Sequence, residues 1–534
     1  MANNNNNGLR NRLSSLDQHP SYKWFVLANV MIGTFMAVLD ATIVNVGLTK
    51  MMSAFGVNVD KIEWVLTAYL LIFAVVLPSS GWIADHLGYK KTYFLGLLLF
   101  TVGSLLCSLS ANENMLIMFR VLQGSGAGFI MPVGMAIVTR EFPPKQRGMA
   151  LGFWGIASAA SVSLGPMIGG YLIDTFSWHA IFDVNVPVGI FALIVTLIIQ
   201  REYKTEHTRS FDLIGFISMT LFLVFLLLAL SDGNASWNTG GWTSDFILSC
   251  FVISFVAFVI FITAELTLKH PIVDLRILKN RNFGLANIML FIFGLSFFGI
   301  TFLVPLYLQS SLGYTALQAG LVFFPVGIIQ AIMSPIAGRM SDRINPKIPI
   351  LIGIILTFLS TYLYKDLSLY SEYKEIIVPL IIRGFGLGFM FIPLSTIAIN
   401  DIPKAKIAQA TGLFNTIRQV GGSFGVAILG SFLTRRVIYH TEMFSEAVNQ
   451  NSAVFKQTVT KLNYFVQHST GSTGAEMVSR SKALIAQNIA NQAFVQGIAD
   501  DFLAGALITL LIIIPLLFLR YHKKKKGDAI EMVE

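Results

Sequence analysis

Long apolar runs alternate with short polar connections along nearly the whole chain. A helix that crosses a bilayer needs about 20 mostly apolar residues. Runs of that kind predict fourteen spans, near 24–48, 62–84, 92–110, 114–138, 149–173, 181–199, 212–231, 245–268, 284–309, 316–338, 348–364, 376–399, 408–433 and 502–519. The predicted fold class is therefore an all-α integral membrane protein with about 14 transmembrane helices. An even number of spans places both termini on the same side.

Glycine patterns of the first half of the chain return about 260 residues later. The repeated positions are Gly124, Gly126 and Gly128 with Gly384, Gly386 and Gly388, and Gly152, Gly165 and Gly170 with Gly412, Gly425 and Gly430. Gly81 and Asp85 return as Gly338 and Asp342, at an offset of 257. A fixed offset in a chain of apolar runs indicates two related six-helix bundles with a substrate path between them.

The spans at 212–231 and 245–268 have no counterpart and look like an inserted pair. The predicted parts are a disordered leader at 1–23, an N-terminal six-helix bundle at 24–199, the inserted pair with its linkers at 200–283, a C-terminal six-helix bundle at 284–519 and a basic tail at 520–534. The C-terminal bundle includes a long polar external segment at 434–501. Ala483 to Gln496 has helical apolar spacing, so this segment is either a helical hairpin or a flexible tether.

Composition and charge agree with a membrane protein. Only 13% of the residues are charged and 54% are hydrophobic, whereas about a quarter are charged in a typical soluble domain. Cys107 and Cys250 both lie in apolar runs, so neither a disulfide framework nor a cysteine metal cluster is expected. Lys and Arg gather in every second connection, at 90–91, 140–147, 201–209, 269–281, 339–347 and 404–406. This asymmetry predicts cytoplasmic termini, and it accounts for the net charge of +9 without a nucleic-acid partner.

Asp40 and Arg120 are the leading candidates for chemistry. Each lies within a predicted span, at a similar depth from the outer end, so the two side chains are placed to pair. Burial disfavours an ionised carboxyl group and a neighbouring cation favours it, and this competition suits a group that binds and releases protons. Two interpretations stay open here: a proton-coupling pair or a permanent structural ion pair.

Other polar residues within spans are candidates for a substrate cavity. They are Asp183, Arg418, Asn45, Gln123 and Gln309. Asp183 is close to a span end, where the alternative is simple hydration. Arg418 has a purely structural role as its alternative.

Glycine-rich motifs mark candidate conformational elements. They are the turn with Gly81, Asp85, Gly88, Lys90 and Lys91, its repeat with Gly338, Asp342 and Arg343, and the span motif with Gly165, Pro166, Gly169 and Gly170. The turns sit at equivalent places in the two halves, so we expect them to latch the halves together on the cytoplasmic side. The span motif permits a kink and close helix packing.

Several of these motifs together resemble a known family. Gly81 to Lys91 resembles the loop signature of the major facilitator superfamily, Arg120 to Gly124 its fourth-helix motif, and Gly165 to Gly170 its antiporter motif. Leu39 to Val46 and Asn185 to Gly189 resemble the fourteen-helix drug:proton antiporters of the EmrB/QacA kind. The segments at 271–276, 327–335 and 488–493 are most similar to the EmrB branch.

The resemblance implies a multidrug efflux antiporter in the bacterial inner membrane. It implies that proton influx drives export of amphipathic toxic compounds, that Asp40 and Arg120 form the coupling site, and that no cofactor is needed beyond the proton gradient. It also implies docking of a periplasmic adaptor of the EmrA type on 434–501. The tenth span, at 316–338, has no acidic residue, unlike family members that handle divalent cations.

The same residues bear on several competing functions. A nutrient or lipid carrier on the same fold stays open, because a fold does not set the substrate. A receptor or sensor needs a cytosolic effector domain, and no predicted inside segment is long enough. Neither a paired His/Asp cluster nor a metal-spaced motif stands out, so we predict no enzyme and no metal site.

Overall fold

A computed structural model describes residues 21–203, 211–235, 237–269, 271–400, 402, 407–448, 452–470 and 473–520. The predicted leader at 1–23 and tail at 520–534 lie almost wholly outside these ranges. Within them the chain is helical and contains no strand. The first half consists of α2 (Tyr22–Phe55), α3 (Val59–Ile62), α4 (Trp64–Leu87), α5 (Tyr89–Ser108), α6 (Glu113–Glu141), α7 (Pro144–Thr175), α8 (Ala180–Asp183) and α9 (Asn185–Ile199).

The inserted pair is α10 (Leu213–Asp232) and α11 (Asp245–Thr267). The second half consists of α12 (Arg281–Ser310), α13 (Ala316–Leu321), α14 (Phe324–Arg343), α15 (Lys347–Tyr362), α16 (Tyr373–Asn400), α17 (Ile407–Ala447), α18 (Ala453–Thr470), α19 (Gly474–Leu510) and α20 (Ile513–Phe518). Short 3-10 turns lie at Gly241–Thr243, Leu275–Lys279 and Leu363–Asp366.

Each predicted span corresponds to one helix, or to a pair of helices interrupted by one or two residues. By length and composition, 12 helices of the described chain are able to cross a membrane. The other two predicted spans are α7 and α17, which are long but richer in small and polar residues. Both pack against the opposite half, α7 on α13 and α14, and α17 on α4. A helix at this seam faces protein instead of lipid, so it needs fewer apolar side chains.

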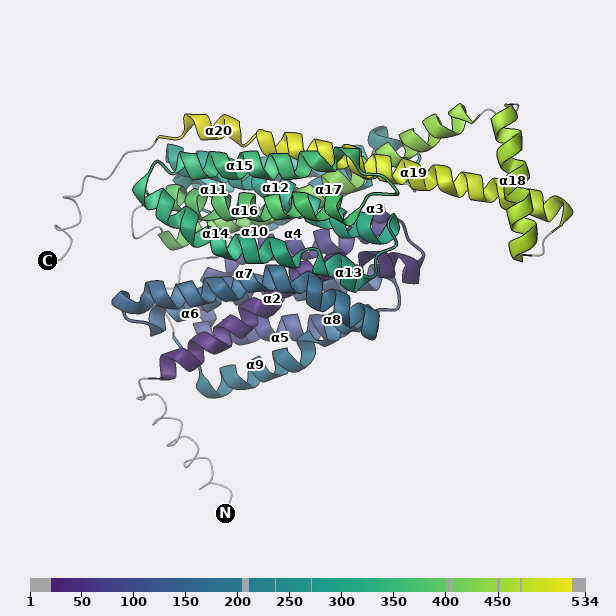
Figure 1. Cartoon of the computed structure of the whole chain (residues 1–534). Coiled ribbons are helices and arrows are strands. Elements are labelled where there is room, and N and C mark those ends of the chain that lie inside the picture. The colour runs from purple at the N-terminus through teal and green to yellow at the C-terminus, as the bar shows by residue number, and fades with distance from the viewer. Residues whose placement is uncertain are drawn as a thin grey trace, which may run out of the picture.

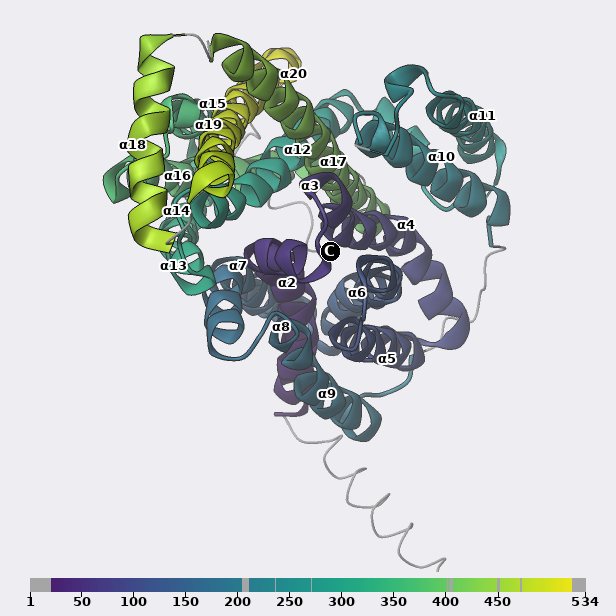
Figure 2. The same cartoon turned by 90° about the vertical axis from the view of Figure 1, so that its right-hand side faces the viewer.

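The two halves lie side by side, and α10 packs against α4 and α17 at the edge of the bundle, with α11 on its outer side (Figure 2). The described chain begins and ends at the same end of the bundle, which we call the termini end (Figure 1). There the backbone of Arg520 is bonded to the side chain of Asn282, at the start of α12. The opposite end carries α18, and we call it the hairpin end.

The segment at 434–501 is helical over most of its length. Both α17 and α19 run out of the bundle at the hairpin end, and α18 lies across their tips (Figure 1). The Arg436 guanidinium and the His440 ring of α17 both bond the Asp500 carboxylate of α19, at 2.6 and 2.7 Å. Gly497 of α19 lies against Val437. The helical-hairpin interpretation is therefore confirmed, and a flexible tether is wrong for the described residues.

The halves are joined at the hairpin end by close contacts between α7 and α13. A side chain on Gly170 would collide with the backbone of Ala316 and Leu317, and one on Gly320 would collide with the carbonyl of Pro166. The Asp174 carboxylate, at the end of α7, accepts hydrogen bonds from the first two backbone amides of α13, at 3.3 and 2.8 Å. This carboxylate of the first half therefore caps a helix of the second half.

A second contact between the halves joins α2 and α12 at the same end. Gln309 donates its amide to the carbonyl of Val46 at 2.8 Å and accepts a hydrogen bond from the Thr49 hydroxyl. With the α7–α13 contact, this closes the hairpin end between the halves.

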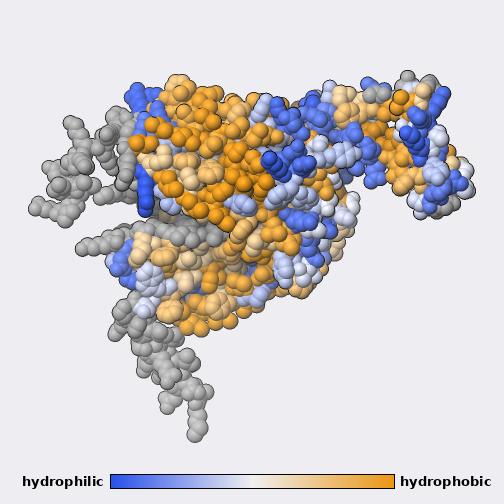
Figure 3. Space-filling view, viewed as in Figure 1, coloured by the Kyte–Doolittle hydropathy of each residue, from blue (hydrophilic) through white to orange (hydrophobic). Residues whose placement is uncertain are grey.

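The face of the bundle seen in Figure 3 is predominantly apolar, while polar residues gather toward the hairpin. α11 illustrates the pattern with a row of exposed apolar side chains, Val252, Phe255, Val256 and Val259. Apolar side chains exposed around a helical bundle mark a surface that faces lipid.

Candidate functional site

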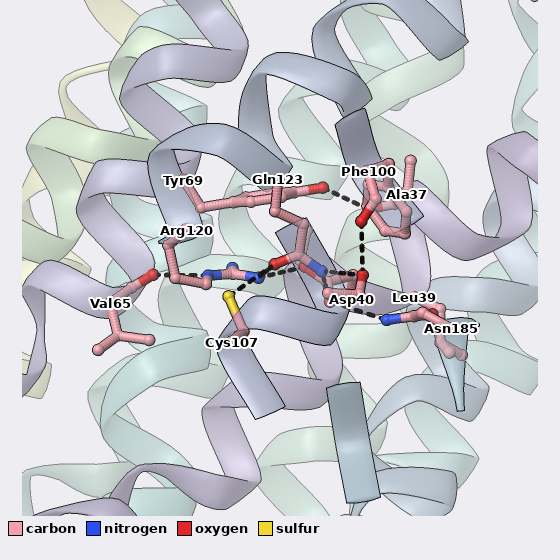
Figure 4. A network of polar contacts seen from close by, with 12 residues as sticks. Ala37, Leu39, Asp40, Val65, Tyr69, Phe100, Cys107, Arg120, Gln123 and Asn185 are labelled. Carbon is pink, nitrogen blue, oxygen red and sulfur yellow. Dashed lines mark hydrogen bonds and ion pairs between the residues drawn. The ribbon is translucent and has the colours of Figure 1, made fainter. Parts of the chain in front are cut away.

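Asp40 of α2 and Arg120 of α6 form a fully buried ion pair (Figure 4). Gln123, one turn along α6, joins them: its amide nitrogen donates to Asp40 Oδ1 at 2.8 Å, and its carbonyl oxygen accepts from Arg120 Nη1 at 2.7 Å. Arg120 Nε donates to the carbonyl of Val65 on α4 at 3.0 Å. The structure thus brings together the two residues that the sequence places at matched depth.

Helix α9 contributes a residue that was not predicted to belong to the site. Asn185 donates its amide to Asp40 Oδ1 at 3.1 Å. It is the first residue of α9, directly after the chain breaks its helix at Val184. The signal available in the sequence was its place in the motif from Asn185 to Gly189. On the other side, Gln123 donates to the Ser104 hydroxyl of α5 at 2.8 Å.

Aromatic rings enclose the guanidinium. The Arg120 guanidinium carbon lies 4.0 Å from the centre of the Tyr69 ring and 5.8 Å from that of Phe182. Tyr69 is held in place because its hydroxyl donates to the carbonyl of Ala37 at 2.9 Å. In such low-dielectric surroundings the attraction between ion and ring, and between the two ions, is stronger than in water.

The energetics of the pair follow from its burial. Removing one partner leaves an uncompensated charge, which costs about 3–5 kcal/mol. Arg120 has further acceptors in Val65 and Gln123, so its charge stays hydrogen-bonded even when Asp40 is neutral.

A cavity of about 270 Å³ lies between α4 and α6–α7 of the first half and α17 of the second. Most of its wall is apolar, and the whole lining is Phe73, Leu77, Met131, Pro132, Met135, Ala136, Thr139, Arg140, Trp154, Gly412, Asn415, Arg418 and Gln419. Arg140 is next to the end of α6, so the cavity extends to the termini end. The lining has two arginines and no acidic residue.

The ion pair and the cavity are connected through α4. The Tyr69 ring, which covers Arg120, packs edge-on to the ring of Phe73, with centroids 6.2 Å apart. Phe73 is part of the cavity wall.

The family of the chain follows from sequence comparison. The family model of the Major Facilitator Superfamily matches residues 30–426. The chain belongs to the Major Facilitator Superfamily. It is therefore a membrane transport protein, as its two related helical halves and the cavity between them also indicate.

Superfamily members with similar sequences include bacterial exporters. The chain is 31% identical to "Multidrug export protein EmrB" of Escherichia coli (strain K12), covering 90% of this chain and 92% of that protein. It is 30% identical to "Fatty acid resistance protein FarB" of Neisseria gonorrhoeae, covering 93% and 95%. It is also 30% identical to "Uncharacterized MFS-type transporter YhcA" of Bacillus subtilis (strain 168), covering 94% and 93%.

Solved structures share the superfamily fold. The crystal structure of a bacterial homolog to the human lysosomal transporter Spinster, in an inward-facing and occupied conformation, aligns with a TM-score of 0.63 at 13% identity. The alignment covers 94% of this chain and 97% of that chain.

The residues predicted to line a substrate cavity lie in different parts of the structure. Arg418 lines the cavity, with its guanidinium 5.2 Å from the Phe391 ring. Asp183 is exposed on α8 and is not part of the cavity wall, so its assignment to the cavity is not supported. Asn45 donates to carbonyls of its own helix, and Gln309 belongs to the closed α2–α12 contact. Helix α8 ends at Asp183, which separates that residue from the inward-facing Asn185.

The first-half glycine turn makes several contacts within its own half. Gly88 has φ +104°, a conformation that favours glycine. Tyr89 donates its hydroxyl to Asp85 at 2.8 Å, and the backbone amide of Lys90 donates to Glu202 at 3.1 Å. Gly81 and Lys91 are exposed. In the second-half turn Gly338 lies on α14, and the side chains of Asp342 and Arg343 are outside the described residues.

The antiporter motif places α7 between two neighbours. A side chain on Gly165 would collide with Thr42 of α2, and one on Gly169 with Ile43. Pro166 and Gly170 face α13 of the other half, as described above. The motif thus lets α7 approach the helix that carries Asp40 and the opposing half at once.

Replacing Asn185 tests the site that the structure defines. Asn185→Ala removes a donor to the buried carboxylate and is expected to cost about 1.5–3 kcal/mol, seen as a lower Tm of the purified protein. The matched control is Asp183→Asn, an exposed position where a change below about 0.5 kcal/mol is expected. Equal losses of Tm in the two variants would contradict the assignment of Asn185 to the Asp40 network.

Proposed function

We propose that this transporter exports amphipathic toxic compounds in exchange for protons, with Asp40 and Arg120 as the coupling site. The observation that carries the proposal is a buried ion pair that contacts, through the rings of Tyr69 and Phe73, the wall of a largely apolar cavity. The names of the relatives EmrB and FarB, a multidrug export protein and a fatty acid resistance protein, support export as the direction.

The proposed exchange uses groups that this chain supplies. A proton that binds the Asp40 carboxylate ends its attraction for Arg120, which keeps its bonds to Val65 and Gln123. The shift of the guanidinium is passed through Tyr69 to the cavity wall. Loss of the proton restores the ion pair. The two states of Asp40 thereby bias the cavity between holding and releasing a compound.

The orientation follows from the charged connections. Excess Lys and Arg in the connections at the termini end favours a cytoplasmic location of that end. The protein is then a multi-pass protein of the bacterial cytoplasmic membrane, and the conformation described here is inward-facing, with its hairpin end closed. A compound enters the cavity from the cytoplasm or the inner leaflet.

The cavity lining favours neutral or anionic compounds. Arg140 and Arg418 are the charged groups of the wall, and no acidic lining residue compensates the charge of a positively charged compound. The alternative of a lipid or nutrient carrier fits the same apolar wall. The direction of transport separates the two functions, since a carrier for nutrients would accumulate its substrate inside.

The hairpin at 434–501 is the proposed docking element for a periplasmic adaptor of the EmrA type. α18 exposes apolar side chains far from the bundle, including Val454, Tyr464 and Phe465. An apolar helix surface held away from the bilayer suits a protein partner. In a two-membrane host, such an adaptor would pass compounds toward the outer membrane.

Transport assays with the Asp40→Asn variant test the coupling. Amide replacement keeps the size of the side chain and removes its proton exchange, so uncoupler-sensitive efflux of an anionic amphipathic dye is expected to fall to the level of cells without the pump. The Asp183→Asn variant is the control and should keep normal efflux. Normal, uncoupler-sensitive efflux by Asp40→Asn would refute Asp40 as the coupling residue.

Cysteine labelling tests the orientation. In intact cells a membrane-impermeant maleimide should label Val454→Cys on α18, and it should label Leu87→Cys, at the termini end, only after the membrane is opened. Both positions are exposed, and the native Cys107 and Cys250 are buried. Labelling of Leu87→Cys alone in intact cells would reverse the proposed orientation.

Shortening the hairpin tests its role. Replacing 446–486 by a Gly–Ser linker keeps the Arg436–His440–Asp500 contact, so transport in purified vesicles should be preserved while adaptor co-purification and cellular resistance are lost. A full-length control replaces Val454, Tyr464 and Phe465 by Ser and removes only exposed apolar side chains. Full resistance of the shortened protein in cells without an adaptor would show that the pump works alone.

A further inference from the structure

The contact between α7 and α13 has a counterpart elsewhere in the repeat. The offset of 257 relates α3, which starts at Val59, to α13, which starts at Ala316. The offset of 260 relates α7 to α17 and Gly170 to Gly430. The counterpart of the α7–α13 contact is therefore the contact of α17 with α3 and α4, which also joins the two halves.

Glu63 stands at the position that glycine occupies in the other contact. Adding 257 to Glu63 gives Gly320, whose missing side chain lets α13 approach Pro166 of α7. Glu63 lies between α3 and α4, and its carboxylate fills the space beside Gly430, where any side chain would collide with it. Because glycine suffices in the equivalent contact, close packing of the helices does not require a carboxylate here.

The groups around Glu63 do not compensate a negative charge on its carboxylate. Its side chain is fully buried, one oxygen accepts a hydrogen bond from the Ser231 hydroxyl of α10, and the other has no hydrogen-bond partner. The charged groups that act on it are acids from three elements: Asp60 of α3, Asp232 of α10 and Asp501 of α19. Glu63 forms no ion pair with any described residue.

The neighbouring groups add to the excess of acid. Asp501 is itself fully buried, and neither of its oxygens has a hydrogen-bond partner. Two cations act on these neighbouring acids, Lys61 on Asp232 and Arg436 on Asp501. α17 contributes Gly430 beside Glu63, and its charged and titratable side chains Arg436 and His440 bond Asp500 of α19. An ionised carboxylate enclosed in this way is costly, and binding a proton removes the cost.

We propose that Glu63 is a proton-controlled latch: the hairpin end closes when Glu63 carries a proton, and opening that end exposes the carboxylate so that it ionises. The contact of Glu63 with Gly430 is made between the halves, so it exists only while the hairpin end is closed. The latch rests on the alternation between two states in the proposed function, and it is independent of Asp40 as the coupling residue.

The sign of the pH effect follows from proton linkage. The closed state binds one proton more than the open state, so lowering the pH at the hairpin end favours closure. For a single proton, the ratio of closed to open molecules rises by at most about tenfold for each unit of pH lowered. In the proposed orientation the hairpin end faces the outside of the cell. Protons from outside therefore favour closure of that end, which returns the protein to the inward-facing state.

Distance measurements between the halves test the latch. Ser53 at the end of α2 and Glu372 before α16 are exposed and belong to different halves, so cysteines there accept a pair of spin labels. In purified full-length protein without drug, the closed fraction should rise as the pH falls. Glu63→Gln should stay closed at all pH values. Glu113→Gln, a less buried acid at the start of α6, should keep the wild-type pH response.

Two variants that change the space between Glu63 and Gly430 test the same contact without a change of pH. Gly430→Ala should lower the closed fraction, because the added carbon meets the Glu63 carboxylate. Combining it with Glu63→Gly, which reproduces the residue of the equivalent contact, should restore closure. The latch would be overturned if the closed fraction of the wild type did not change with pH. It would also be overturned by a full pH response in Glu63→Gln, or by an unchanged closed fraction in Gly430→Ala.

The latch and the proposed function can fail separately. The pH response of the distance should survive in Asp40→Asn, and its loss there would assign the response to Asp40 and overturn the latch. If the pH response depends on Glu63 while wild-type efflux is insensitive to an uncoupler, the proton-coupled export is wrong and the latch stands. If efflux is uncoupler-sensitive and Glu63→Gln responds like the wild type, the latch is wrong and the function stands.

Discussion

The cost of burying charge inside a bilayer is the constraint on which this structure depends. Asp40 and Arg120 meet it by pairing, and neutral donors from α6 and α9 satisfy the remaining carboxylate oxygen. A pair that is satisfied in this way is stable, yet Arg120 keeps other acceptors when Asp40 is neutral. The same constraint makes Glu63 informative, because its carboxylate is buried without a cation. One site solves the charge problem by pairing, and at the other we propose that a bound proton does so.

Close packing between the halves is the second determinant. Gly170 and Gly320 let the backbones of α7 and α13 meet, and Gly430 makes room for Glu63 in the equivalent contact. Contacts that depend on missing side chains tolerate little variation in distance, so they are either made or broken. Such all-or-none contacts are what a transporter needs to alternate between two arrangements.

The inserted pair α10–α11 is tied to both halves at the hairpin end. Ser231 bonds Glu63 of the first half, and Asn234, just after α10, bonds the hydroxyl of Ser431 in the second at 3.0 Å. Trp64, next to Glu63, donates to Asp232 of α10 at 3.3 Å. The helices that interrupt the repeat thus meet the contact between the halves that contains Glu63, and any opening there has to rearrange these bonds.

The sequence by itself determined the number and approximate limits of the spans, the repeat and the pairing of Asp40 with Arg120. Helix length, apolar content and depth in the bilayer are local properties that can be read along the chain. Tertiary structure decided the rest. The helix break at Val184 leaves Asp183 exposed, while Asn185 points toward Asp40. The two residues are only two positions apart, so the sequence could not tell which of them faces the ion pair. The role of Glu63 depends on Gly430, which lies far along the chain and meets it only when the halves pack together.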